Sequence, residues 1–245
     1  MDIIAEIGMN HLGSYEKAIE YVNCLIKSNV DAITFQIREP EFYDRSDKKH
    51  LMLTNDNYKN LCNIIKNHNK KFGIAIADIE KIDFFKSIDT DFYKIIRNDI
   101  TNKNLVNKLI QTNKKLIVST GVSSEEEIQK FLNKFGNKNI VLNHTQLSYD
   151  VQDCNLSAIE TLKTKYNYPI SYGSHCSNEN VLYMSLCYNP SDILFYVKDN
   201  IEQIKYPDDK HAIMLRNVDN IVKNLKSLIH AVGTGIKEKM EIKIK

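Results

Sequence analysis

Residues 3–14 of this chain read Ile-Ile-Ala-Glu-Ile-Gly-Met-Asn-His-Leu-Gly-Ser. An apolar run that contains one carboxylate, Glu6, ends in Gly8, Asn10 and His11, and a helical pattern begins directly after it. This order predicts a buried strand that delivers polar groups to a strand-to-helix turn. A buried carboxylate is costly unless it is paired or used, so Glu6 is a first candidate for a functional residue.

The same order of strand and helix repeats along the chain. Short apolar runs predict strands at 3–7, 32–37, 72–77, 92–96, 115–119, 139–143, 169–172 and 192–197. Helical periodicity follows each of them, at 15–28, 55–69, 80–88, 102–112, 124–135, 155–166, 178–188 and 217–231. Eight such units predict an α/β fold, a single-domain (β/α)8 TIM barrel over residues 1–235, with a short charged tail at 236–245.

Local signals mark some of the element ends. Ser123 with Glu126 predicts a capping box at the start of the 124–135 helix, and Gly233 predicts the end of the last helix. The two longest stretches without periodicity, 38–53 and 198–216, both follow strands. We therefore expect them at the C-terminal mouth of the barrel, where this fold builds its active sites.

Composition and charge exclude several classes of function. The chain has 245 residues and a net charge of +2, so neither a nucleic-acid partner nor an anionic membrane surface is indicated. No apolar stretch is long enough to span a membrane and no signal peptide precedes the first strand, so we expect a cytoplasmic protein. The five cysteines form no CxxC pair, which argues against a disulfide framework.

In a parallel barrel, the side chains that finish the strands converge on one pocket. The predicted strand ends present, in chain order, Glu6, Asn10, His11, Gln36, Arg38, Asp78, Glu80, Lys94, Arg97, Asp99, Ser119, Thr120, Asn143, His144, Thr145, Gln146, Ser174, His175, Lys198 and Asp199. So many cations, carboxylates and hydroxyls indicate a site for a charged ligand. Lys94 and Arg97 with the hydroxyl of Ser119 suit a phosphate or a carboxylate, and His175 is a candidate acid, base or metal ligand.

Structural alternatives stay open for several of these residues. In one alternative, Lys94 forms an ion pair with Asp99 at the rim of the barrel, and Lys94 then takes no part in the site. His144 is equally well explained as a hydrogen-bonded packing residue. Tyr149 either gates the mouth of the barrel or covers its rim.

Four parts of the chain resemble the sialic acid synthase family, which condenses phosphoenolpyruvate with an amino sugar. They are 5–13, 92–95, 119–128, and the fragment 155–159 together with 169–175. The resemblance implies that Glu6 contacts the sugar, that Lys94 and Ser119 bind phosphoenolpyruvate, and that His175 binds a divalent metal such as Mn²⁺. The Pro207-Asp208 pair is similar to the family's Gly-Pro-Asp loop, which implies a substrate contact by Asp208. The substrate-binding residues we predict are Asn10, Gln36, Arg97, Ser119, Gln146 and Asp208.

The chain departs from the family pattern at three places. Thr34 stands where the family usually has Lys, and Arg97 stands where Ser is common. The run 195–197 reads Phe-Tyr-Val instead of Glu-Lys-His or Glu-Arg-His, so Val197 takes the place of the second metal ligand, for which Asp199 and His211 are candidate substitutes.

The sequence ends at Lys245, where the family continues into an antifreeze-like domain. We therefore expect the barrel domain alone. The usual sugar pocket and the domain-swapped dimer of the family are then in question, and a homo-oligomer stays an open alternative.

The favoured function is a phosphoenolpyruvate-dependent condensation with an aldehyde sugar, which gives a sialic-acid-like 2-keto sugar acid and phosphate. Its predicted catalytic residues are Glu6, Lys94 and His175. A second hypothesis is an aldolase or lyase, or a metal-independent variant, that acts on a phosphorylated sugar. A third is a degenerate barrel that binds a sugar or a partner without turnover.

Overall fold

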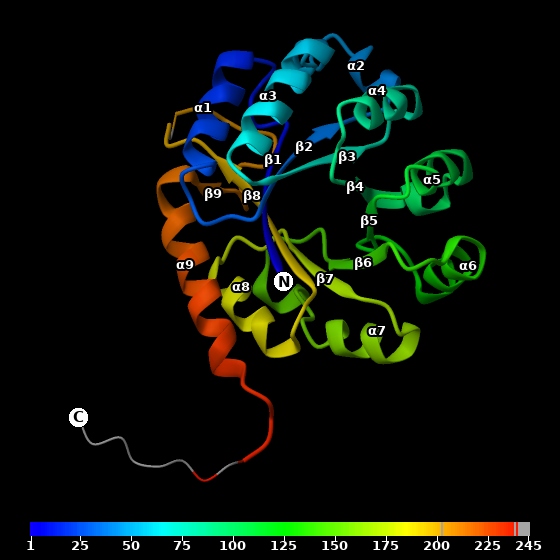
Figure 1. Ribbon diagram of the computed structural model, residues 1–245, viewed down its shortest axis with the longest axis vertical. Helices are drawn as coiled ribbons and strands as arrows, with labels where there is room; N and C mark the ends of the chain where they lie inside the picture. Colours follow the sequence, from blue (N-terminus) through cyan, green and yellow to red (C-terminus); the bar gives the residue numbers. More distant parts are fainter. Residues whose placement is uncertain (202, 238, 240–245) are drawn as a thin grey trace.

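The computed structural model describes residues 1–201, 203–237 and 239. Eight parallel strands pair in sequence order, and β1 also pairs with β8, which closes the barrel. The helices lie around the outside of the strands (Figure 1). The eight barrel strands are β1 Asp2–Gly8, β2 Ala32–Ile37, β3 Lys71–Ile76, β4 Phe92–Ile95, β5 Lys115–Ser119, β6 Ile140–Thr145, β7 Ile170–Ser174 and β8 Asp192–Lys198. The predicted TIM barrel is confirmed.

The α-helices are α1 Tyr15–Leu25, α2 Pro40–Tyr43, α3 Asn55–Asn67, α4 Ile82–Ser87, α5 Lys103–Ile110, α6 Glu125–Phe135, α7 Ala158–Tyr166, α8 Asn180–Ser185 and α9 Leu215–Val232. The two aperiodic stretches contain the short α2 and the two-residue strand β9 Ile213–Met214, which pairs with the end of β8. Most of the predicted tail, 236–245, lies outside the described residues. No helix in the described part of the chain is long and apolar enough to cross a membrane.

Two of the predicted helix ends can be compared with the structure. The capping box of α6 is wrong by one residue, because the Ser124 hydroxyl accepts from the Glu127 N–H while the Glu127 carboxylate accepts from the Ser124 N–H. Gly233 ends α9 with φ at +68°, as expected.

Alternate residues along each strand divide the molecule into an inner and an outer core. The outer core lies between strands and helices and holds most of the buried aliphatic and aromatic side chains, including Ile3, Ala5 and Ile7 of β1. The inner core is a separate apolar layer inside the barrel, made of Ile4, Ala32, Phe92, Ile117, Val141 and Leu194. Gly73 makes this layer possible, because a Cβ there would lie 2.1 Å from the Phe92 ring.

Two residues further along each of these strands, the inward positions become polar. They are Glu6, Thr34, Lys94, Ser119, Asn143 and Tyr196. Each lies above the apolar layer because the side-chain period of a strand is two. The apolar layer therefore forms the floor of a polar site at the C-terminal end of the barrel.

Candidate active site

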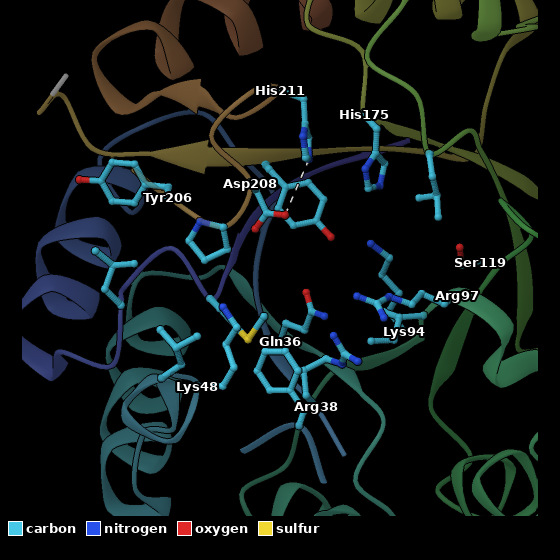
Figure 2. A pocket seen from close by; sticks show the side chains of 18 of the residues that line it. Gln36, Arg38, Lys48, Lys94, Arg97, Ser119, His175, Tyr206, Asp208 and His211 are labelled. Atoms are coloured by element: carbon cyan, nitrogen blue, oxygen red, sulfur yellow. Dashed lines mark ion pairs between the residues drawn. The ribbon is translucent and has the colours of Figure 1, made fainter. Parts of the chain in front are cut away.

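The polar layer opens into a cavity of about 610 Å³ at the C-terminal mouth of the barrel. Its wall includes six of the predicted functional residues, Gln36, Lys94, Arg97, Ser119, His175 and Asp208. In Figure 2, Lys94, Arg97 and Arg38 face His175, His211 and Asp208 across the open space. The aperiodic stretches 38–53 and 198–216 both contribute to this wall, as predicted.

A buried ion pair lies at the base of the cavity. The Lys94 Nζ is 2.5 Å from Glu6 Oε2, and the two side chains are 5% and 0% exposed. The rim pairing of Lys94 with Asp99 is therefore wrong. The other Glu6 oxygen, Oε1, is buried without a hydrogen-bond partner among the described residues. Glu6 thus stands behind Lys94 rather than in the cavity wall, with one oxygen still available to a donor.

Gly8 shapes the loop that follows Glu6. The register of β1 against β2 shifts between Glu6 and Gly8, and Gly8 has φ at +57°. A Cβ at Gly8 would lie 3.1 Å from Tyr196 Cε1 and 3.2 Å from Asp208 Oδ2. Glycine is needed here for both its backbone conformation and its lack of a side chain.

Asn10 connects the first strand to the last. Its Nδ2 donates to the Val197 carbonyl at 2.8 Å, and its Oδ1 accepts from the Asp208 N–H at 3.2 Å. Asn10 is fully buried and lies outside the cavity wall, as does the half-buried Gln146. The structure therefore gives Asn10 a positioning role for the Asp208 loop, and it does not bring Gln146 to the cavity.

One wall of the cavity is cationic. The Arg38 guanidinium makes a bidentate contact with the Glu39 carboxylate: Nε donates to Oε2 at 2.8 Å and Nη2 donates to Oε1 at 2.5 Å. Arg97 has φ at +49°, and it has neither an ion-pair nor a hydrogen-bond partner among the described residues. A non-glycine residue in this conformation stores about 1–3 kcal/mol of strain and is typical of functional sites. An anionic ligand would supply the partner that Arg97 lacks.

The opposite wall carries two neutral histidines. Burial lowers the pKa of His175 to about 3, with added repulsion from His211 and Lys94. Burial likewise lowers the pKa of His211 to about 4, and the positive charges of Lys94 and Lys198 act in the same direction. The two rings are stacked with their centroids 4.6 Å apart.

Asp208 is the titratable carboxyl of the site. Burial and the Glu6 charge raise its pKa to about 7, against the opposing effect of Lys94 and Arg97. Its Oδ1 lies 3.9 Å from His211 Nε2 (Figure 2). Because His211 is neutral near pH 7, this contact is not an ion pair there. A carboxyl with a pKa near neutrality is suited to proton transfer.

The end of β8 corrects one expectation. Val197 points outward into the outer core, so its side chain faces away from the cavity. The inward position is Tyr196, whose ring lies 5.5 Å from Lys94 Nζ. Burial, with the charges of Glu6 and Asp208, raises the pKa of the Tyr196 hydroxyl well above its usual value. Our sequence reasoning missed Tyr196, because a tyrosine within an apolar strand is typical of a core.

The two candidate substitutes for a metal ligand differ in position. Asp199 pairs with Lys17 and accepts from the Tyr206 hydroxyl, so it is already engaged. His211 instead lies beside His175, and both of its ring nitrogens are buried without a partner among the described residues. This fits a metal ligand, although the described residues contain no cluster of three or more His, Cys, Asp or Glu arranged to hold an ion.

Two alternatives at the rim are also informative. His144 is buried, and its Nε2 lies 3.0 Å from the Cys154 carbonyl, which agrees with the packing interpretation. Tyr149 is 41% exposed, lines the cavity and stacks on His211 at 5.7 Å. Tyr149 therefore covers the histidine side of the mouth.

A family model described as the NeuB family matches residues 20–237. The chain belongs to the NeuB family. This confirms the resemblance to sialic acid synthases. The NeuB-family chain is 33% identical to an uncharacterized protein of Methanocaldococcus jannaschii over 71% of this chain and 55% of that protein. It therefore spans little more than half of that relative's length.

A second relative is the N,N'-diacetyllegionaminic acid synthase of Campylobacter jejuni, 26% identical over 96% of the NeuB-family chain and 78% of the synthase. Among solved structures, an N-acetylneuraminic acid synthetase from Leptospira borgpetersenii matches with a TM-score of 0.90 at 24% identity. That match covers 97% of this chain and 87% of that one. At this identity the match supports the fold alone.

Proposed function

We propose that this NeuB-family protein condenses phosphoenolpyruvate with an aldehyde sugar, forming a sialic-acid-like 2-keto sugar acid. The reaction joins the methylene carbon of phosphoenolpyruvate to the aldehyde carbon. One water is consumed, and cleavage of the phosphate ester releases phosphate and leaves the 2-keto group. The observation that carries the proposal is the cavity itself, in which a cationic wall faces a wall of neutral histidines and a carboxyl.

The cationic wall would hold phosphoenolpyruvate. Lys94, Arg97 and Ser119 line the cavity together and present two cations and a hydroxyl to an anion. Charge-assisted hydrogen bonds of this kind are worth about 1.5–3 kcal/mol each. Glu6 keeps the Lys94 ammonium in place, while Arg97 reaches the ligand from the rim.

The opposite wall would hold the sugar. Neutral His175 has an N–H that can donate to the aldehyde oxygen, and Asp208 can exchange a proton near neutral pH. Glu6 lies behind Lys94, so it would act on the site through the Lys94 ammonium and not by touching the sugar. A divalent metal, when bound by His175 and His211, would add Lewis-acid polarisation of the same oxygen.

The test is phosphate release by the purified protein with phosphoenolpyruvate, Mn²⁺ and a panel of aldoses that includes N-acetylmannosamine. We expect release that depends on one sugar class, is lost in Lys94→Met and is retained in Lys130→Met, since Lys130 is exposed on α6. Absence of release across the panel, together with no thermal shift by phosphoenolpyruvate, would overturn the proposal.

A further inference from the structure

A buried cluster of charged and phenolic side chains, which we call the Asp199 cluster, lies beside the cavity and consists of Lys17, Asp199 and Tyr206. The Asp199 carboxylate pairs with the Lys17 ammonium and accepts from the Tyr206 hydroxyl. The Lys17 and Asp199 side chains are 16% and 12% exposed, and Tyr206 is buried. No step of the proposed reaction uses these groups, so their burial in one place needs another explanation.

The Asp199 carboxylate is a charged acceptor with several donors. Besides the ammonium and the hydroxyl, the Ile201 N–H donates to it at 2.9 Å. Burial acts to raise the pKa of Asp199, but these donors outweigh it and hold the pKa below its usual value. Hydrogen bonds to an ionised group are stronger than those between neutral groups. The cluster is therefore a firm attachment point for the loop that follows β8.

The first helix holds the beginning of this loop. Lys17 and Tyr21 are one turn apart on α1, so they face the same neighbour. The Asp199 N–H donates to the Tyr21 hydroxyl at 2.7 Å, while the Asp199 carboxylate contacts Lys17. One face of α1 thus binds both the backbone and the side chain of Asp199.

Tyr206 extends this attachment to the cavity. It stands two residues before Asp208, and both residues line the cavity. In Figure 2 the Tyr206 hydroxyl points away from the open space, whereas Asp208 lies closer to it. The hydroxyl therefore serves Asp199 and not a ligand. Pro207 stands between the two residues and has a fixed φ, so holding Tyr206 also limits where Asp208 can lie.

Asp208 is then held from two directions. Asn10 accepts its N–H at 3.2 Å, and the Asp199 cluster holds the residue two positions before it. Lys198 Nζ also donates to the Asp209 carbonyl at 2.7 Å, which fixes the chain directly after Asp208. A functional side chain needs such supporting contacts if it is to stay within about 0.5 Å of its working position.

We infer that Asp199 and Tyr206 are positioning residues that fix the Asp208 carboxyl in the cavity, with Lys17 as the counter-charge. The consequence for turnover rests on the proposed function, but the attachment of the loop does not. In Figure 2 Tyr206 and Asp208 lie across the cavity from Lys94 and Arg97. Loss of the cluster should therefore impair use of the sugar and spare the binding of phosphoenolpyruvate.

The first measurement is hydrogen–deuterium exchange of the full chain, read by mass spectrometry in peptides from 203–214. Tyr206→Phe removes the hydroxyl and keeps the ring. We expect exchange in these peptides to become at least about fivefold faster, because a hydrogen bond to a charged group is lost. Tyr166→Phe is the matched control, since the Tyr166 hydroxyl donates to the Glu125 carbonyl at 3.1 Å on the outer side of the barrel, and it should leave these peptides unchanged.

The second measurement is phosphate release, with the sugar and phosphoenolpyruvate varied in turn. We expect Tyr206→Phe to lower kcat/KM for the sugar by about tenfold or more and to change KM for phosphoenolpyruvate by less than about twofold. In an Asp208→Asn background, Tyr206→Phe should have little further effect, because both changes act through one carboxyl. A purely structural role would affect both substrates alike and would add to the Asp208 change.

Lys17→Met, which removes the ammonium from the same carboxylate, replaces Tyr206→Phe if circular dichroism shows that the phenylalanine variant is unfolded. The inference is overturned if the folded variant exchanges in 203–214 as slowly as the unaltered chain. It is also overturned if the effect on turnover adds fully to that of Asp208→Asn, or if KM for phosphoenolpyruvate rises as much as KM for the sugar. Faster exchange in the variant, with no phosphate release by the unaltered chain on any sugar, would support the attachment and refute only the proposed reaction.

Discussion

The buried pair between Glu6 and Lys94 permits a quantitative test of the site. Lys94→Met keeps most of the side-chain length and removes the charge. Glu6 is 0% exposed, and its second oxygen has no hydrogen-bond partner among the described residues. Loss of the Lys94 ammonium therefore leaves a buried carboxylate whose charge is not compensated. We expect this single change to destabilise the fold as well as abolish turnover.

The expected magnitude follows from the burial of the pair. Removing one partner of a buried ion pair costs about 3–5 kcal/mol, because the remaining charge is left without compensation. At about 2–4 °C per kcal/mol for a chain of this size, the melting temperature should fall by about 6–20 °C. Combining Glu6→Gln with Lys94→Met removes both charges and should recover about 2 kcal/mol or more of that loss.

The assay is urea unfolding at pH 7 followed by circular dichroism, for the two single variants, the double variant and a control. Lys71→Met is the control, since it removes an exposed pair with Asp2 and should cost less than about 1 kcal/mol. The reasoning is refuted if the double variant is no more stable than Lys94→Met. A loss in Lys94→Met no larger than in the Lys71 control would also refute it.

Three further predictions concern the surrounding residues. Burial lowers the pKa of His11 to about 4, so between pH 6.5 and 4 the unfolded state binds more protons and the unfolding free energy falls as the pH falls. By pH 4 this effect of His11 lowers the free energy of unfolding by about 3 kcal/mol. The His11→Asn variant should lose this part of the pH dependence in urea-unfolding curves measured across that range. Gly8→Ala should cost about 2–4 kcal/mol in thermal unfolding and lower turnover, because strain and two close contacts add. Gly233→Ala, with nothing within 4 Å of the added Cβ, should cost only about 1 kcal/mol. Arg97→Ala should raise KM for phosphoenolpyruvate about 10- to 100-fold in the phosphate-release assay, since it removes one charged contact.

Each of these predictions has a clear contrary result. The difference in unfolding free energy between the unaltered chain and His11→Asn should change between pH 7 and pH 4. If it stays constant, His11 is not an acid-sensitive group. Equal losses in the two glycine variants would mean that the contacts with Tyr196 and Asp208 are easily relieved. An unchanged KM in the Arg97 variant, with kcat also unchanged, would place Arg97 outside the phosphoenolpyruvate site.

The fold could be predicted because its signals are local. Apolar runs and helical periods depend on neighbouring residues, and eight repeats leave few alternatives to a barrel. Helix ends were less certain, as the capping box at Ser124 shows, because adjacent serines offer equivalent signals. The lining residues Lys94, Ser119 and His175 were found for the same reason, since each lies within three residues of the C-terminal end of a predicted strand.

Sequence patterns were enough to predict the eight βα units, the mouth that carries the site and most of its cationic wall, because periodicity and strand ends are encoded within a few residues. Which of these residues meet depends on the folded barrel. The pairing of β1 with β8 sets Tyr196 beside Glu6 and turns Val197 outward. Closure of the barrel joins Glu6 to Lys94 and His175 to His211, contacts between distant segments that depend on strand register and loop path.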